Sequence, residues 1–263
     1  MKAVWRWVGL VLLAGLLLQL FFVARIAAML VIDPQSTAFE RSEVWRVTTE
    51  KGELHWRQQW TPYDKISNNL KRAVIASEDD DFVNHDGVDW DALEKAWQKN
   101  AIAEERAAKA QELAAKAQAR IAAKNPAKAA AAPVPKPVKA PKVVGGSTIT
   151  QQLAKNLFLS GERTLLRKGQ EFMLAMMLEA ILNKQRILEI YLNSVEWGEG
   201  IFGAEAAAQH YFHKPAAQLS AYESARLAVM LPRPKYFEKL PNSSYVAGRA
   251  RIIANRLESA ELP

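Results

Sequence analysis

A run of acidic residues beside aromatic side chains is the first place in this chain where acid–base chemistry could occur. Residues 78–81 read Glu-Asp-Asp-Asp, and Phe82 and His85 follow closely. A carboxylate that is half-buried beside an aromatic ring has a raised pKa and can take a proton from a hydroxyl, and Glu78 is placed for that role. On this stretch alone, a charged loop whose aspartates cap the next helix is the favoured interpretation, with His85 as a structural hydrogen-bonding residue.

A second set of charged residues could bind a phosphate group. Arg163, Arg167 and Glu171 follow one another at intervals of four, so they would share one helix face, with Lys168 beside them. Guanidinium groups in a row with one carboxylate suit a pyrophosphate. The alternative is an ordinary ion-pair stripe, which stabilises a helix by only about 0.2–0.5 kcal/mol per pair. Because Arg precedes Glu, the poorer order for such pairs, function is slightly favoured.

Between these two sets, the stretch 145–158 predicts the start of a helix that can receive an anion. Gly145 and Gly146 allow a close approach of the backbone, and Ser147 is the predicted N-cap. The unsatisfied N–H groups of a helix start attract negative charge. Apolar residues at every fourth position predict its buried face: Ile149, Leu153 and Leu157.

The composition bounds the chemistry of the whole chain. The 263 residues hold 35 Lys and Arg against 28 Asp and Glu, a formal net charge of +7, and no cysteine. The lack of cysteine excludes a disulfide framework, a thiolate metal site and a thiol nucleophile. The positive charge fits nucleic acid, anionic lipid or a phosphate-bearing substrate without choosing among them.

The N-terminus predicts a membrane anchor. Residues 7–24 are uncharged and apolar, and residues 26–32 extend the run past Arg25, which is enough for a span of roughly 20 residues. Lys2 and Arg6 precede the run, so the positive-inside rule places the N-terminus in the cytoplasm. A cleaved signal peptide is the alternative, but the run is longer than the usual apolar region and no clear cleavage site follows it.

The remainder is predicted to be one mainly α domain. We expect residues 1–32 to form the cytoplasmic tip and transmembrane anchor, and residues 33–263 to form the domain. Residues 100–142 are a low-complexity insertion rich in Ala, Lys and Pro, helix-prone in its first part and leaning toward polyproline II in its second. Periodicity predicts a short strand or hairpin around 44–47 and helices at 63–77, from 89 onward, and at 164–183, 185–193, 204–212, 221–230 and 245–257.

Taken in order, these motifs resemble the peptidoglycan glycosyltransferases of glycosyltransferase family 51, most closely the monofunctional, membrane-anchored biosynthetic ones. The likeness covers roughly residues 32–257. Five blocks in the same order leave little room for chance. The matching blocks are Glu78-Asp79 with Phe82, His85 and Gly87; the stretch 145–158; Arg167-Lys168 with Glu171 and Glu179; residues 186–193; and residues 200–212.

The resemblance implies polymerisation of lipid II, the undecaprenyl-pyrophosphate-linked disaccharide-pentapeptide. The growing chain would be transferred, with inversion, to the 4-hydroxyl of the acceptor lipid II. Glu78 matches the general base, and Glu171 matches a second essential carboxylate near the donor pyrophosphate. Whether Glu171 also holds a divalent cation, Mg²⁺ or Mn²⁺, stays open. The cationic groups that match those neutralising the leaving group are Lys155, Arg163, Arg167 and Lys168, and the groups that match those lining the donor cleft are Ser147, Gln152 and Asn156.

The resemblance also implies a fold and a location. Such proteins have an α-helical, lysozyme-like head with a smaller membrane-facing lobe, here joined to one N-terminal transmembrane helix. The expected location is the bacterial inner membrane, with the catalytic domain on the periplasmic side. The expected partners are lipid II, the growing glycan strand, the membrane and other cell-wall synthesis or division proteins, but not nucleic acid. Neither Ser-x-x-Lys nor Lys-Thr-Gly occurs, so we expect no transpeptidase activity.

Two other classes remain. A lysozyme-like muramidase also uses two carboxylates, and a non-catalytic, anchored cell-wall scaffold needs none. The basic residues around Glu171 argue against a hydrolase, because hydrolysis leaves no pyrophosphate to neutralise. The chain departs from the family pattern at 100–142, where the link between the first two blocks is longer than usual. This departure affects what the resemblance implies about the acceptor site and processivity more than what it implies about the chemical step.

Overall fold

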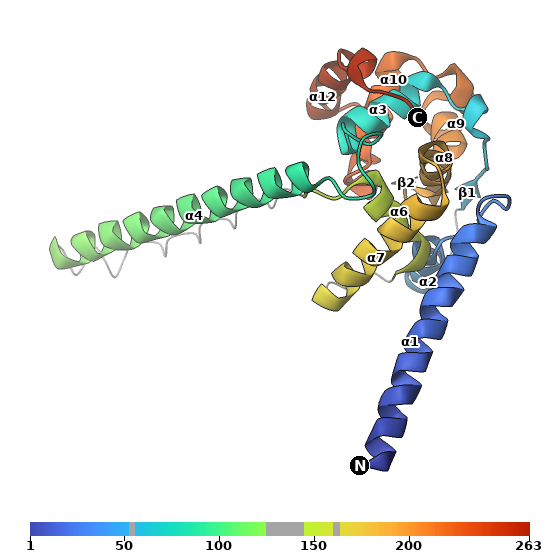
Figure 1. Cartoon of the computed structure of the whole chain (residues 1–263). Coiled ribbons are helices and arrows are strands. Elements are labelled where there is room, and N and C mark those ends of the chain that lie inside the picture. Colours follow the sequence, from blue (N-terminus) through green and yellow to red (C-terminus); the bar gives the residue numbers. More distant parts are fainter. Residues whose placement is uncertain (53–55, 125–144, 160–163) are drawn as a thin grey trace. The chain divides into compact units, whose positions relative to one another are not determined.

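The computed structural model describes residues 1–52, 56–124, 145–159 and 164–263, and helices dominate it (Figure 1). The chain divides into two compact units. One consists of Met1–Val88 with Ser147–Pro263, and the other of Asp89–Gly146. The prediction of a mainly α protein is therefore confirmed, whereas the predicted domain boundaries stay a prediction.

The first helix agrees with the predicted membrane anchor. Helix α1, Lys2–Ala28, has 27 residues and is long and apolar enough to cross a membrane. At 1.5 Å per residue it rises about 40 Å, more than the roughly 30 Å of a hydrocarbon core. Only its C-terminal part is buried by the rest of the unit, at Phe22 and Ile26. There the Arg25 guanidinium lies 5.1 Å from the centre of the Phe158 ring.

The prediction of a strand or hairpin around residues 44–47 is wrong, because these residues lie within helix α2, Ala38–Lys51. A capping box fixes the start of α2. The Thr37 hydroxyl accepts the Glu40 N–H at 3.0 Å, and the Glu40 carboxylate accepts the Thr37 N–H at 2.7 Å. The helix ends at Gly52, whose φ of 73° is left-handed. These start and stop signals outweigh four alternating residues.

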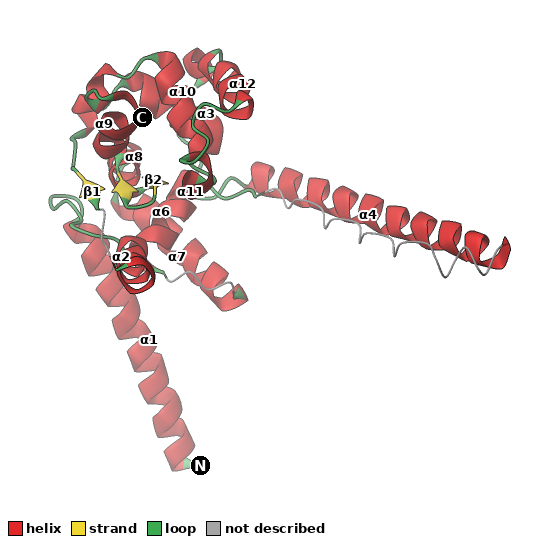
Figure 2. Ribbon diagram, turned by 180° about the vertical axis from the view of Figure 1, so that it is seen from behind, coloured by secondary structure: helices red, strands yellow, loops and turns green. Residues whose placement is uncertain are grey.

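Helices make up most of the rest of the larger unit, which also contains a small sheet (Figure 2). Strands β1, Arg57–Gln58, β2, Glu196–Gly198, and β3, Ile201–Phe202, lie in the order β1-β3-β2. β1 is parallel to β3, and β2 is antiparallel to it. The helices are η1 Tyr63–Lys65, α3 Asn68–Glu78, α6 Ile149–Phe158, α7 Leu165–Ile181, α8 Lys184–Ser194, α9 Ala204–Phe212, η2 Ala216–Gln218, α10 Ala221–Met230, α11 Pro234–Phe237, α12 Ser244–Ala254 and η3 Leu257–Ser259.

Most predicted helices in this unit are confirmed within a few residues. The exception is 63–77, which is divided: η1 comes first, and α3 begins after Ser67, whose hydroxyl accepts the Asn69 N–H at 3.2 Å. The apolar face predicted for the stretch 145–158 is fully buried in α6. Trp197 is among the largest fully buried side chains, and its indole N–H donates to the Leu227 carbonyl at 3.1 Å.

Gly203 is a position where only glycine fits. It precedes α9 with a φ of 84°, and a Cβ there would lie 2.8 Å from the Asn193 carbonyl oxygen. We expect Gly203→Ala to lower the free energy of unfolding by about 1–3 kcal/mol, as measured by chemical denaturation in detergent. The matched control is Gly248→Ala in the exposed middle of α12, where a Cβ meets nothing within 4 Å and should stabilise by about 0.5–1 kcal/mol. A Gly203→Ala protein as stable as the control would contradict the assignment.

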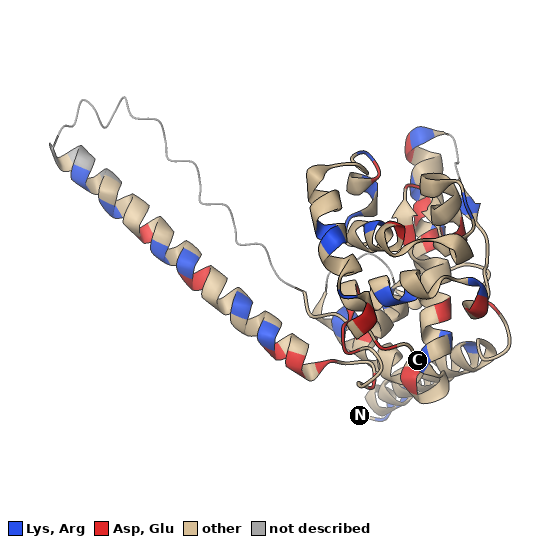
Figure 3. Ribbon diagram, turned by 90° about the horizontal axis from the view of Figure 1, so that it is seen from above, with Lys and Arg blue, Asp and Glu red and all other residues tan. Residues whose placement is uncertain are grey.

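The smaller unit contains helix α4, Trp90–Lys124. Asp89 begins the helix by accepting the Ala92 N–H at 2.7 Å. Basic and acidic residues are interspersed along α4 (Figure 3), and exposed pairs join Glu105 to Lys109 at 2.6 Å and Glu112 to Lys116 at 2.5 Å. The first part of the predicted insertion is therefore helical. Residues 125–142 of that insertion lie outside the described residues.

Candidate active site

Glu78, the predicted base, is the last residue of α3 and is half-buried. Its Oε2 accepts a hydrogen bond from Gln152 Nε2 of α6 at 3.0 Å. The Tyr191 hydroxyl of α8 in turn donates to Gln152 Oε1 at 3.0 Å. Tyr191 therefore sets the orientation of the Gln152 amide, and the amide positions the Glu78 carboxylate.

Burial raises the pKa of the Glu78 carboxyl, and the neighbouring Asp79 charge adds to the increase. The hydrogen bond from Gln152 and the positive charge of Lys155 oppose it, because both favour the ionised form. A half-buried carboxylate with a raised pKa is a stronger base than an exposed one. This environment suits proton abstraction from a hydroxyl.

Asp79 joins the end of α3 to the start of α6. Its carboxylate accepts the backbone N–H of Ile149 at 2.9 Å and lies 2.9 Å from His85 Nε2. Since His85 Nδ1 accepts the Gly87 N–H at 3.1 Å, the proton is assigned to Nε2, which donates to Asp79. His85 thus has the structural role expected of it. The aspartate binds the N-terminus of a helix about 70 residues away in the chain, so sequence spacing did not reveal this contact.

The predicted N-cap at Ser147 is wrong, because Thr148 caps α6. The Thr148 hydroxyl accepts the Gln151 N–H at 3.1 Å and donates to the Gly87 carbonyl at 2.7 Å. Both residues have capping hydroxyls, but only Thr148 makes this second bond. Ser147 instead accepts a hydrogen bond from Lys168 Nζ at 3.3 Å.

Glu171 is buried in α7 between two cations. Arg167 Nη1 lies 2.9 Å from its Oε2, and Lys168 Nζ lies 2.5 Å from its Oε1. The predicted face of Arg167 and Glu171 is therefore an ion pair within one helix. Arg167 Nε is buried and has no acceptor among the described residues. Arg163, predicted to extend this face, lies outside the described residues.

Lys155, the predicted leaving-group cation, projects from α6 near both carboxylates. Desolvation is the largest cause that lowers the pKa of its ammonium. The charge of Glu171 raises this pKa, those of Arg167 and Lys168 lower it, and that of Glu78 raises it slightly. Lys155 makes no hydrogen bond or ion pair of its own in the described part of the chain. It is an unpaired cation within electrostatic range of both predicted carboxylates.

Comparison with known proteins identifies the family that has this arrangement. A family model described as Transglycosylase matches residues 46–110 and 122–258. The chain belongs to the transglycosylase family. It is similar to proteins named biosynthetic peptidoglycan transglycosylase from Burkholderia thailandensis (51% identity over 266 residues, 100% of this chain and 90% of the relative), Paraburkholderia xenovorans (46% over 262, 98% and 94%) and Burkholderia pseudomallei (48% over 266, 100% and 90%).

The resemblance to monofunctional family 51 transglycosylases is therefore confirmed. In this transglycosylase most of the predicted site residues lie on α6 and α7, and Ser147 lies just before α6. Asn156 is buried on α6, one residue beyond Lys155. The roles of the individual residues stay a prediction, as do the lysozyme-like head and its smaller lobe.

A hydrogen-bond network that the sequence did not reveal joins α7 to α6, to α8 and to the loop that contains His85. Glu179 of α7 accepts hydrogen bonds from the Thr150 hydroxyl at 2.6 Å and from Lys184 Nζ at 2.8 Å. Lys184 Nζ also donates to the His85 carbonyl. A Cβ at Gly87, whose φ is 85°, would lie 3.0 Å from Glu179 Cγ. Gly87 and Glu179 belong to the matching blocks of the family. The hydrogen-bond partners of Glu179 were not predicted, because these lie on α6 and α8 and are brought close only by the fold.

The site offers few ligands for a metal ion. No group of three or more His, Cys, Asp or Glu side chains that could hold one occurs in residues 1–52, 56–124, 145–159 and 164–263. Both oxygens of Glu171 already face cationic partners. Divalent Mg²⁺ and Mn²⁺ prefer several oxygen ligands, so the described side chains by themselves fit such an ion poorly.

Proposed function

We propose that this transglycosylase polymerises lipid II into glycan strands for cell-wall synthesis. One observation carries the proposal: helix α6 holds Gln152 against Glu78 and presents Lys155 near Glu171. Helix α6 thereby positions the base at the end of α3 for the acceptor hydroxyl and itself carries a cation for the leaving group. The relatives, named biosynthetic peptidoglycan transglycosylases, agree with this reaction.

The proposed reaction is an inverting displacement at the anomeric carbon of the donor. Glu78 takes the proton of the acceptor 4-hydroxyl as that oxygen bonds to the anomeric carbon. The bond from this carbon to the undecaprenyl pyrophosphate breaks in the same step, and no covalent enzyme intermediate forms. Because a hydroxyl is a weak nucleophile, a positioned base contributes about 10²–10⁴-fold to such a step.

The cations near Glu171 are proposed to stabilise the pyrophosphate as it leaves. Negative charge grows on the leaving group in the transition state, where fixed cations stabilise it most. Among the described residues, Lys155 is unpaired and a buried N–H of Arg167 has no acceptor. Lys168 is held by Glu171 and Ser147. Gln152, Ser147 and Asn156 are proposed to line the donor site, and Arg163 to add a further cation.

A divalent cation at Glu171 stays a prediction, and no step above depends on it. Lipid II polymerisation with and without EDTA tests it. A rate that falls under EDTA and recovers with Mg²⁺ or Mn²⁺ supports a metal at this carboxylate, provided that Glu171→Gln removes the dependence. A rate that EDTA leaves unchanged excludes it.

The location and partners extend the same proposal. An apolar α1 is consistent with an anchor in the membrane that contains lipid II. From Lys2 and Arg6 ahead of the apolar run we propose that the catalytic unit lies on the periplasmic side of the inner membrane. Other cell-wall synthesis or division proteins are proposed partners. Without the two transpeptidase motifs in the sequence, we propose glycosyl transfer alone.

Two incubations separate the proposed function from its alternatives. Purified protein is given lipid II in one reaction and finished sacculi in the other. The proposed synthase makes polymer from lipid II and releases nothing from sacculi, whereas a muramidase releases fragments from sacculi. A scaffold does neither.

The raised pKa of Glu78 predicts a pH dependence. The base must be ionised, so kcat/KM falls as the pH falls through this raised pKa. Gln152→Leu removes a hydrogen bond that favours the ionised form. We therefore expect its acidic limb to lie at a higher pH than that of the wild type, as measured by initial polymerisation rates between pH 4 and 9, a range of roughly the ordinary carboxyl pKa and above. An unshifted or lower limb in Gln152→Leu would contradict the assignment of the limb to Glu78.

A further inference from the structure

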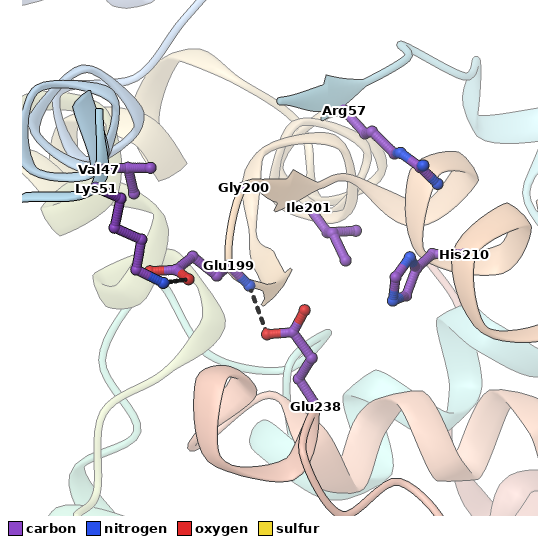
Figure 4. Close-up of a pocket in the computed structure, with 8 residues that line it drawn as sticks. All are labelled: Val47, Lys51, Arg57, Glu199, Gly200, Ile201, His210 and Glu238. Atoms are coloured by element: carbon purple, nitrogen blue, oxygen red, sulfur yellow. Dashed lines mark hydrogen bonds and ion pairs between the residues drawn. The ribbon is translucent and has the colours of Figure 1, made fainter. Parts of the chain in front are cut away.

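A pocket lies apart from the candidate active site, between α2, the small sheet, α9 and the residue that follows α11 (Figure 4). Its volume is about 400 Å³. Sites for small molecules are roughly 300–1,000 Å³, so the pocket is large enough for a compact ligand. Both polar and apolar side chains line it, among them Val47, Lys51, Arg57, Ile201, His210 and Glu238.

Two charges of this pocket are already paired. Glu199 forms ion pairs with Lys51 and with Arg46, the latter at 2.9 Å. Hydrogen bonds from Lys51 and then Arg46 lower the pKa of Glu199 to about 2. These groups therefore close one side of the pocket and leave little charge for a ligand.

On another side, neither Arg57 nor His210 forms an ion pair with a described residue, although the charge of Glu238 acts on His210. The Arg57 backbone N–H bonds to the Gly200 carbonyl at 2.8 Å and fixes β1 to β3. Its guanidinium, in contrast, makes no hydrogen bond or ion pair within the described parts of the chain and extends toward the His210 ring (Figure 4). Burial is the largest cause that lowers the pKa of His210; Glu238 raises it, and Arg57 and His213 lower it. A guanidinium fork beside an imidazole matches a carboxylate.

The remaining charged group is Glu238, which has the opposite sign. Its Oε2 accepts the Glu199 N–H at 2.9 Å (Figure 4), and no cation lies within ion-pair distance among the described residues. Gly198 makes room for this carboxyl, because a Cβ there would lie 3.1 Å from Glu238 Cδ. Glu238 would repel a simple anion in the pocket but would attract an ammonium group.

We propose that this pocket binds a zwitterion, either a free α-amino acid or a dipeptide. Its carboxylate pairs with Arg57 and accepts a hydrogen bond from the His210 ring, and its ammonium pairs with Glu238. A small aliphatic side chain packs against Val47 and Ile201. The site is independent of the proposed polymerisation, since none of these side chains belongs to the candidate active site.

Calorimetric titration of the full chain in detergent tests the proposal. The probes are L-alanine, L-alanyl-L-alanine, N-acetyl-L-alanine, which lacks the ammonium, and L-alaninamide, which lacks the carboxylate. We expect alanine or the dipeptide to bind, and either blocked derivative to bind at least about tenfold more weakly, because each loses a charged hydrogen bond.

Variants connect this binding to the two free charges. Arg57→Gln and Glu238→Gln should each weaken binding of the preferred probe by about tenfold or more. Arg249→Gln, on the exposed surface of α12, is the matched control and should leave the affinity unchanged. Thermal melting confirms that each variant is folded.

The titrations with alanine and with the dipeptide also identify the source of the ligand. Equal affinity for alanine and the dipeptide assigns the site to free amino acids, and a dipeptide that binds much more tightly assigns it to peptides. The absence of binding by both probes overturns the proposal. So does equal binding of N-acetyl-L-alanine and alanine, or unchanged affinity in both Arg57→Gln and Glu238→Gln.

Discussion

Glu78→Gln is expected to abolish the polymerisation of lipid II, with a loss of about 10²–10⁴-fold or more in the initial rate. The amide keeps the size of the side chain and can still accept the hydrogen bond from Gln152. It cannot take the proton of the acceptor hydroxyl. Because Glu78 is charged and half-buried with a raised pKa, its neutral isostere should not destabilise the fold.

The matched control for this variant is Asp80→Asn in the same acidic run. Asp80 is exposed and pairs with Arg256 at 2.6 Å, a surface contact worth about 0–1 kcal/mol. We expect this protein to polymerise at the wild-type rate. Wild-type activity in Glu78→Gln, or an equal loss in both variants, would refute Glu78 as the base.

The second large effect is expected for Glu171→Gln, which should nearly abolish polymerisation. This carboxylate is buried between Arg167 and Lys168 and, among the described residues, is the only negative group that pairs with them. Without it, the two cations repel each other and lose the geometry that the leaving pyrophosphate requires. Loss of one fixed electrostatic contact of this kind costs about 10²–10³-fold in kcat, which steady-state kinetics on lipid II measures.

Glu171→Gln also breaks a buried ion pair and so reduces stability, which could by itself lower the activity. A second variant therefore tests the cations of the leaving group without breaking an ion pair. Lys155→Met removes a cation that makes no ion pair in the described chain, and it should lower kcat without lowering the melting temperature. The control is Glu105→Gln, which breaks an exposed pair with Lys109 and should change neither. Normal kcat in folded Glu171→Gln and Lys155→Met would show that these groups do not serve the leaving group.

Helices with a periodic apolar face were predictable from the sequence. Ile149, Leu153 and Leu157 recur every four residues, and all three are fully buried in α6. The i, i+4 spacing of Arg167 and Glu171 likewise predicted their contact, because helix geometry alone sets it. Local chemistry of this kind needs no knowledge of the rest of the fold.

Contacts between distant segments were not predictable in the same way. Gln152 was expected to line the donor site, but its bond to Glu78 crosses 74 positions in the chain. Asp79 was expected to cap the following helix, yet it binds the N-terminus of α6. In both cases the partner is decided by how α3, α6 and α8 pack. Sequence periodicity does not specify such packing.

Two local predictions failed, for different reasons. Around residues 44–47 the alternation of apolar and polar residues favoured a strand, but the Thr37–Glu40 capping box and Gly52 define a helix. Ser147 and Thr148 are equally good caps by residue type, and the Gly87 carbonyl selects Thr148. The first error could have been avoided by weighing start and stop signals, whereas the second depends on tertiary structure.

The most direct test of the proposed mechanism measures lipid II binding and lipid II turnover on the same preparation of Glu78→Gln. Binding is followed with fluorescent lipid II in detergent micelles, and turnover by gel analysis of the glycan product. We expect wild-type affinity with no polymer, because the base is lost while Lys155, Arg167 and Lys168 still hold the pyrophosphate. Polymer formed at the wild-type rate, or affinity lost together with turnover, would contradict it.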